Sequence, residues 1–152
     1  MIEPSLLGSL PGLRSVQAGA LFWTISDFQS VQALSAIALS KLSKDPKSHG
    51  PLTAAGGVRM SLNLVSSANL DCARHATLAL RQLASGVEFR AKVLQGVASY
   101  AAGCLEVEYG GASRLLAELM EDRGNRSVLL ELGVVPAIVK MARSKKESPD
   151  VR

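Results

Sequence analysis

Few residues in this sequence have both the type and the spacing that chemistry requires. Cys72 and His75 lie three positions apart, so on a helix they would share one face and could bind one metal ion. A structural zinc site needs two further ligands and a catalytic site at least one. The only other cysteine and histidine, Cys104 and His49, lie far off in the sequence and lack paired spacing. We therefore expect no metal site and two buried, reduced thiols.

The motifs of common catalytic sites are also missing from the sequence. The glycine pairs Gly56–Gly57 and Gly110–Gly111 are not followed by the residues of a phosphate-binding loop. No serine stands in a nucleophile elbow. The acids Glu106 and Glu108 have a spacing that is common on solvated surfaces. We expect no catalytic residue, no cofactor and no enzymatic activity.

The charge of the chain is mildly basic. Seventeen Lys and Arg residues against thirteen Asp and Glu give a net charge of +4, and the cations are spread along the whole sequence. Nucleic-acid binding is an alternative that we disfavour, because acidic residues interrupt the basic ones and no aromatic stacking platform accompanies them. The basic residues in question are Lys44, Lys47, Arg143, Lys145 and Lys146.

The composition of the 152 residues is that of a folded helical domain. Hydrophobic residues make up 47% of the chain, but aromatic residues only 4%. A core of leucine and alanine with so few rings suits closely packed helices better than a sandwich or barrel. The apolar run 16–25 contains Gln17 and is shorter than a membrane span. We expect one all-α domain over residues 1–152 with no membrane span.

An internal repeat in the sequence indicates which helices would position any binding residues. Residues 30–43 align with residues 71–84, 41 positions later, and more weakly with residues 108–121. The matched positions include Ile37 with Leu78, Leu39 with Leu80 and Leu116, and Leu42 with Leu83 and Leu119. Such self-similarity is the signature of a repeat architecture.

Each repeat predicts three helices. The segments 47–57, 88–96 and 124–133 are short and amphipathic, and each ends in glycine, as a helix with a glycine cap does. An apolar second helix follows each glycine. A polar break with helix-capping residues then precedes a longer third helix. We expect these breaks at Ser26–Asp27, Asn69–Asp71 and Ser148–Asp150.

These patterns resemble the armadillo repeat family. The residues that support this resemblance are Val31-Gln32 with Ser35-Ala36 and Ala38-Leu39, and Asn125-Arg126 with Gly133 and Val135-Pro136. The resemblance covers residues 9–152 and implies an all-α, right-handed α-solenoid of about three repeats. The expected repeats are 9–56, 57–95 and 96–132, with the start of a further repeat at 133–152. We expect this domain to be a piece of a longer array.

The resemblance also implies a function, which is protein–protein interaction along a concave groove lined by the third helices. Several cations on this face favour an acidic or phosphorylated segment of a protein or peptide as the partner. By helical spacing, the groove would contain Ala33, Ile37, Lys41, Arg74, Leu78, Gln82, Arg114 and Glu118, with Arg81 at its margin. The protein would then act as a scaffold or adaptor.

One subfamily of armadillo proteins fits poorly. The importin-alpha nuclear-import adaptors hold basic peptides with a ladder of Trp and Asn on the third helix. The corresponding pairs in this chain are Ile37/Lys41, Leu78/Gln82 and Arg114/Glu118, which lack both residue types. The only tryptophan, Trp23, lies outside this ladder, and we expect it between helices. A nuclear-transport peptide carrier is therefore a disfavoured alternative.

Two further expectations follow from the repeat. Reduced cysteines favour a cytoplasmic protein, with the nucleus and the cytoskeleton as alternative locations. A solenoid also exposes apolar surface at its ends unless capping elements cover it. We therefore expect self-association through exposed repeat ends.

Overall fold

The described part of the chain is entirely helical. The computed structural model describes the backbone of residues 13–144 and the side chains of residues 28–144. Residues 13–144 form eight α-helices and two 3-10 helices, without a strand, which confirms the expected all-α class. The elements are α2 (Leu13–Leu42), η1 (Pro46–Ser48), α3 (His49–Ala54), α4 (Gly57–Val65), α5 (Leu70–Ser85), α6 (Val87–Gly103), η2 (Glu106–Glu108), α7 (Tyr109–Leu119), α8 (Arg123–Glu131) and α9 (Val135–Ala142).

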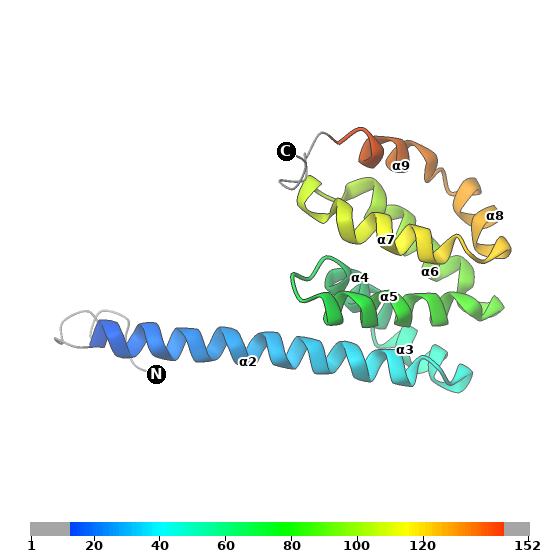
Figure 1. Ribbon diagram of the computed structural model, residues 1–152. Helices are drawn as coiled ribbons and strands as arrows, with labels where there is room; N and C mark the ends of the chain where they lie inside the picture. The colour runs from blue at the N-terminus through cyan, green and yellow to red at the C-terminus, as the bar shows by residue number, and fades with distance from the viewer. Residues whose placement is uncertain (1–12, 145–152) are drawn as a thin grey trace.

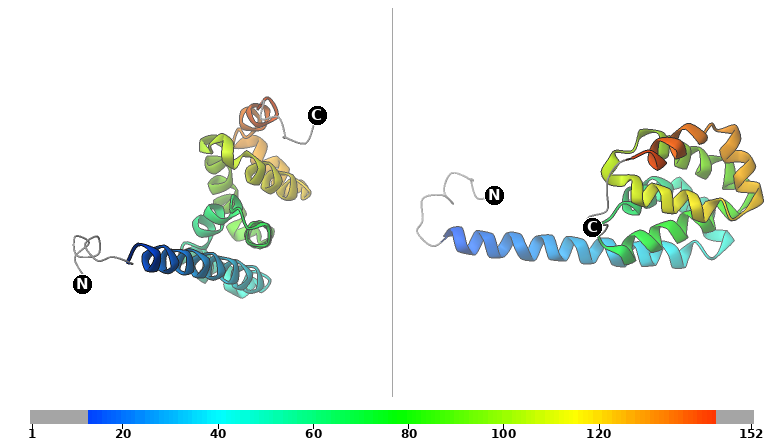
Figure 2. Two further views of the ribbon diagram at one scale, coloured as in Figure 1. Left: turned by 60° about the vertical axis from the view of Figure 1, so that its left-hand side comes forward. Right: turned by 45° about the horizontal axis from the view of Figure 1, so that its top comes forward.

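Three helices, α2, α5 and α7, follow one another through space in the order of the sequence (Figures 1 and 2). Helix α5 contacts α2 on one side and α7 on the other. The helices between them in sequence join these neighbours, since α4 contacts both α2 and α5, and α6 contacts both α5 and α7. Helix α9 contacts α6 and α7. Leucines dominate the core, among them Leu80, Leu83, Leu94, Leu115 and Leu119, each less than 2% exposed.

The ends of several helices have the capping chemistry that the sequence predicts. Asn69 precedes α5, and its Oδ1 accepts hydrogen bonds from the backbone N–H groups of Asp71 (3.0 Å) and Cys72 (3.2 Å). Two glycines in the left-handed region, Gly56 (φ 84°) and Gly133 (φ 74°), follow α3 and α8. The helix start at Asn69 and the glycine stops near residues 57 and 133 are therefore confirmed.

Two predicted breaks are wrong. Helix α2 runs without interruption through Ser26 and Asp27, and α6 runs through Gly96. Polar residues and glycine cost a helix at most about 1 kcal/mol, so neighbouring helical residues can override them. Gly96 faces α4, where an added Cβ would lie 3.4 Å from Val58 Cγ1 and 3.6 Å from Leu62 Cδ1, at ordinary contact distance. The expected repeat boundary at 95/96 consequently falls inside one helix.

Some predictions fall on residues that the structure does not describe. The helix start expected at Ser148–Asp150 lies outside the described range, and so does the side chain of Trp23. In residues 13–144, no helix has the length and apolar content needed to cross a membrane, and this includes the 30-residue α2.

One kind of side-chain hydrogen bond recurs after each of the helices α2, α5 and α7. His49 Nε2 donates to the carbonyl of Ser43 (2.7 Å), Arg90 Nε to that of Ala84 (3.1 Å), and Asn125 Nδ2 to that of Leu119 (3.0 Å). In each case the acceptor is six residues earlier, near the C-terminal end of α2, α5 or α7. Carbonyl groups at helix ends lack partners within the helix, so these donors satisfy them. The three donors differ in residue type, which hides the recurrence from sequence comparison.

Replacement of Asn125 by alanine tests this contact. The side chain is 2% exposed, so its loss leaves the Leu119 carbonyl without its donor in a buried place. We expect the free energy of unfolding to fall by about 1 to 3 kcal/mol, measured by urea denaturation. The exposed neighbour Arg126, changed to alanine, is the control. Equal effects of the two substitutions would contradict a structural role of the Asn125 amide.

Candidate protein-binding face

The predicted groove residues lie on α2, α5 and α7, which contact one another in succession and which we call the long helices because they correspond to the long third helices predicted from the repeat. We call this surface the long-helix face. Within it, Ile37 and Leu78 are half-buried, while Lys41, Arg74 and Arg114 are exposed. Its members are Ala33, Ile37 and Lys41 on α2, Arg74, Leu78, Arg81 and Gln82 on α5, and Arg114 and Glu118 on α7. Because α2 contacts α5 and α5 contacts α7, these residues come from adjacent helices.

Hydrogen bonds hold α2 and α5 together beside this face. Ser43 Oγ donates to Gln82 Oε1 (2.5 Å), and Ser40 Oγ lies 3.0 Å from His75 Nδ1. Both serines are buried. The amide oxygen of Gln82 is thus already engaged within the fold.

Ion pairs connect α5 with α7 and with the turn after α7, on the same side of the molecule. The guanidinium of Arg81 lies 3.3 Å from a carboxylate oxygen of Glu118 and 3.4 Å from one of Glu121. All three side chains are substantially exposed, so the pairs contribute little to stability. Their main consequence is electrostatic, because two carboxylates of the same chain already balance the positive charge of Arg81. Arg81 was expected at the groove margin, and the structure makes it a link between helices.

A recess of about 320 Å³ lies between α5 and α7, and it brings three predicted groove residues together. Its lining residues are Asp71, Arg74, His75, Thr77, Leu78 and Glu118. Within residues 28–144, no carboxylate lies within 4 Å of the cationic group of Arg74 or Arg114. An exposed guanidinium with no such partner can donate paired hydrogen bonds to a carboxylate or phosphate. Leu78 adds an apolar surface next to Arg74.

The cysteine and histidine that share a helix face do not converge on a metal site. Cys72 Sγ points to the carbonyl of Gln32 on α2 (3.8 Å), and His75 meets Ser40 on the same helix. Among the described residues, no group of three or more potential ligands could hold a metal ion. Burial raises the pKa of the Cys104 thiol, which keeps it protonated at neutral pH and a weak nucleophile.

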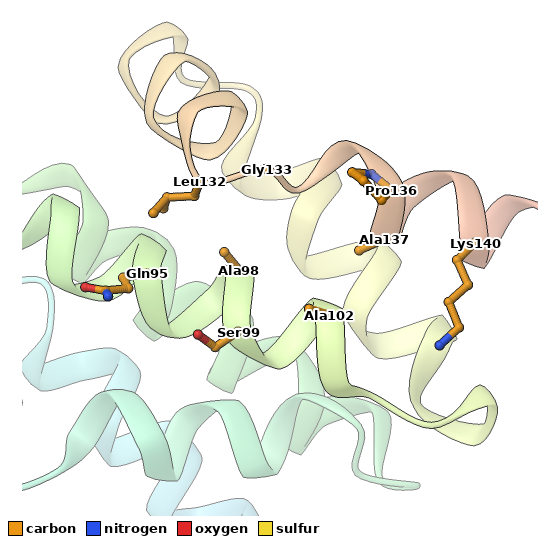
Figure 3. Close-up of a pocket in the computed structure, with 9 residues that line it drawn as sticks. All are labelled: Gln95, Ala98, Ser99, Ala102, Leu132, Gly133, Pro136, Ala137 and Lys140. Atoms are coloured by element: carbon orange, nitrogen blue, oxygen red, sulfur yellow. The ribbon is translucent and has the colours of Figure 1, made fainter.

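The structure contains a second recess that the sequence does not indicate. It lies between α6 and α9, measures about 430 Å³, and is lined mainly by small or apolar residues (Figure 3). Small residues on α6, Ala98, Ser99 and Ala102, leave this space open. Its only charged group, Lys140, lies with Nζ 5.9 Å from the centre of the Tyr109 ring. This recess lacks the several cations that distinguish the long-helix face.

The basic residues considered for nucleic-acid binding do not gather in one described patch. Lys44 and Lys47 follow the C-terminal end of α2, whereas Arg143 follows the C-terminal end of α9. These two helix ends lie on opposite sides of the helical stack (Figures 1 and 2). Lys145 and Lys146 lie outside the described residues. The separation of the described cations favours no continuous track for a phosphate backbone.

Comparisons with protein-family models, with curated proteins and with solved structures gave no match to this chain. Evidence on function therefore comes from the residues and their arrangement. The clearest local feature is a row of helices that presents exposed arginines beside an apolar surface on one side.

Proposed function

We propose that the chain is an armadillo-like, right-handed α-solenoid of about three repeats. Three observations support this arrangement. Helices α2, α5 and α7 contact one another in sequence order, a donor six residues after each long-helix end satisfies its carbonyl, and left-handed glycines stand after α3 and α8. The repeat that contains α6 departs from the family pattern, because one helix replaces the first two.

The function we propose is that of a protein–protein interaction scaffold or adaptor rather than an enzyme. The long-helix face would bind an extended segment of a partner protein across α2, α5 and α7. A stiff row of helices holds its side chains at fixed spacing before binding, which lowers the ordering cost of association. The proposal includes a cytoplasmic location, consistent with the free, buried Cys72 and Cys104.

The observation that carries the proposal is the contrast between the arginines of the long-helix face. Arg81 is matched by Glu118 and Glu121, whereas Arg74 and Arg114 are exposed and have no ion pair within the described residues. A partner segment with carboxylate or phosphate groups would supply the missing charge, and an apolar residue of that segment would lie on Leu78. Basic segments, including those carried by nuclear-import adaptors, would be repelled.

The experiment is a binding titration with short fluorescent peptides. One peptide alternates glutamate and serine around a central leucine, and a second has lysine in place of glutamate. We expect the acidic peptide to bind and the basic peptide not to bind. Charge reversal of both arginines (Arg74→Glu, Arg114→Glu) should weaken acidic binding about tenfold to a hundredfold, through the loss of charge-assisted hydrogen bonds.

A matched control separates the site from the overall charge. The double variant Arg59→Glu, Lys92→Glu changes the net charge by the same amount but alters exposed residues of α4 and α6. We expect this control to bind the acidic peptide nearly as well as the wild type does at moderate salt. Equal losses in both double variants, or stronger binding of the basic peptide, would overturn the proposal.

A further inference from the structure

Each long helix has a stripe of residues that faces the preceding elements of the stack, which we call the back stripe. On α5 it consists of Cys72, Ala76, Ala79 and Leu83, each at most 1% exposed, and Cys72 contacts the Gln32 carbonyl of α2. On α7 the equivalent Ala112, Leu115 and Leu119 are each 0% exposed. On α2 the same register positions are all exposed, with Val31 at 59% and Leu42 at 54%. These α2 positions are Val31, Ser35, Ala38 and Leu42.

A second stripe, the front stripe, faces the following elements. On α2 it consists of Ala36, Ser40 and Ser43, each at most 2% exposed, and both serines meet side chains of α5. On α5 it consists of Thr77, Arg81 and Ala84, and Arg81 pairs with α7. Thr77 and Ala84 are buried, whereas Arg81 is exposed and reaches Glu118 of α7, so the front stripes of α2 and α5 both meet the next of these three helices.

The front stripe of α7 borders an unfilled apolar recess. Its residues Ser113, Ala117 and Met120 line a space of about 280 Å³ together with Leu116 and three residues of α9. The α9 residues are Ile138, Met141 and Ala142. Earlier in the chain, α5 packs against both α2 and α4, and α7 against both α5 and α6. The recess between α7 and α9 is thus the place where a further long helix would pack.

We propose that this recess binds the back stripe of α2 from a second copy of the chain. The two ends of the described stack offer the two halves of an interface that already occurs twice within the molecule, between α2 and α5 and between α5 and α7. Val31, Ser35, Ala38 and Leu42 of the second copy would take the places that Cys72, Ala76, Ala79 and Leu83 occupy on α5. The occupant is thus a helix of the same type, in the same register.

This interface is head-to-tail, because it joins different surfaces of the two copies. Such an interface leaves one free α2 stripe and one free recess in every dimer, so it continues into longer assemblies unless it closes into a ring. A symmetric dimer through two α2 helices would instead stop at two copies.

The test uses the full chain and two end-specific variants, with mass measured by sedimentation across concentration. The first variant, Val31→Glu with Leu42→Glu, disables the α2 stripe. The second, Ala117→Glu, disables the recess. All three positions are exposed, so both variants are expected to fold, and helical content by circular dichroism checks this.

We expect the wild type to form species larger than a dimer with rising concentration, and each variant to remain monomeric alone. An equal mixture of the two variants should form a one-to-one dimer, because only one intact stripe and one intact recess meet. A wild type that stays monomeric up to about 1 mM would overturn the proposal. An Ala117→Glu variant that still dimerises alone would also overturn it, in favour of symmetric α2 pairing.

The inference rests on the repeat arrangement of the proposed function and not on peptide binding. Both end-specific variants leave Arg74 and Arg114 intact. Peptide binding by a monomeric variant would therefore support the scaffold function whatever the outcome for self-association. Conversely, an Arg74→Glu, Arg114→Glu variant that no longer binds the peptide but assembles like the wild type would show that self-association does not require the peptide-binding surface.

Discussion

Replacement of Leu80 by alanine is expected to lower the free energy of unfolding by about 2 to 5 kcal/mol. Leu80 is 0% exposed on α5, the helix that contacts α2, α4, α6 and α7. The substitution removes apolar contacts and leaves a cavity that the four surrounding helices cannot fill without moving. Urea denaturation monitored by circular dichroism measures the loss.

The repeat register supplies the matched controls for Leu80. Leu116 holds the same position on α7 and is 3% exposed, whereas Leu39 holds it on α2 and is half-buried. We expect Leu116→Ala to cost nearly as much as Leu80→Ala, and Leu39→Ala clearly less, because less apolar area leaves water at that site. A larger loss at Leu39 than at Leu80 would contradict the described packing.

Replacement of Gly111 by alanine is expected to destabilise the fold by about 1 to 3 kcal/mol, through overpacking. A Cβ at this position would lie 2.6 Å from the carbonyl oxygen of Val65 and 3.1 Å from the Cα of Ser66. Both are backbone atoms at the end of α4, so relief requires α4 and α7 to move apart. The thermal unfolding midpoint of the variant measures the effect.

The adjacent glycine is the control for Gly111. A Cβ on Gly110 would meet no atom within 4 Å, although both glycines lie in the first turn of α7. Because glycine is a poor helix former, Gly110→Ala is expected to be neutral or to stabilise by up to about 1 kcal/mol. Opposite signs at two neighbouring positions would show that close approach of α4 requires Gly111. Two equal losses would contradict that reason.

The sequence predicted most of the helices because periodicity and capping are local properties. The position of α4, α5 and α9 follows from apolar runs and from Asn69 and Gly133. Helix α7 also starts near the expected place, in spite of its glycines. Local patterns could not predict whether a residue of a helix-capping type would in fact end a helix. Gly96 looks like a helix stop in sequence, but its packing against α4 depends on residues more than thirty positions away.

For the predicted binding residues too, the sequence indicated positions along each helix but not contacts between helices. Helical spacing sufficed to place Arg74, Leu78 and Glu118 around one recess. It could not indicate that Arg81 would be matched by Glu118 of α7 and by Glu121 just after that helix, or that the Gln82 amide would accept from Ser43. Both contacts depend on the register between neighbouring helices. Arg81 and Gln82 are therefore engaged within the fold, and the exposed cations that remain for a ligand on the candidate face are Lys41, Arg74 and Arg114, with Leu78 as the apolar surface beside Arg74.

The most direct test of the proposed scaffold face is a nuclear magnetic resonance titration with the acidic peptide. Backbone amide shifts of the labelled chain report which residues the peptide contacts. We predict that the largest changes occur at Lys41, Arg74, Leu78 and Arg114, on three helices that are neighbours only in the folded stack. Largest changes around Ala98 and Pro136, in the recess between α6 and α9, would contradict the proposed face.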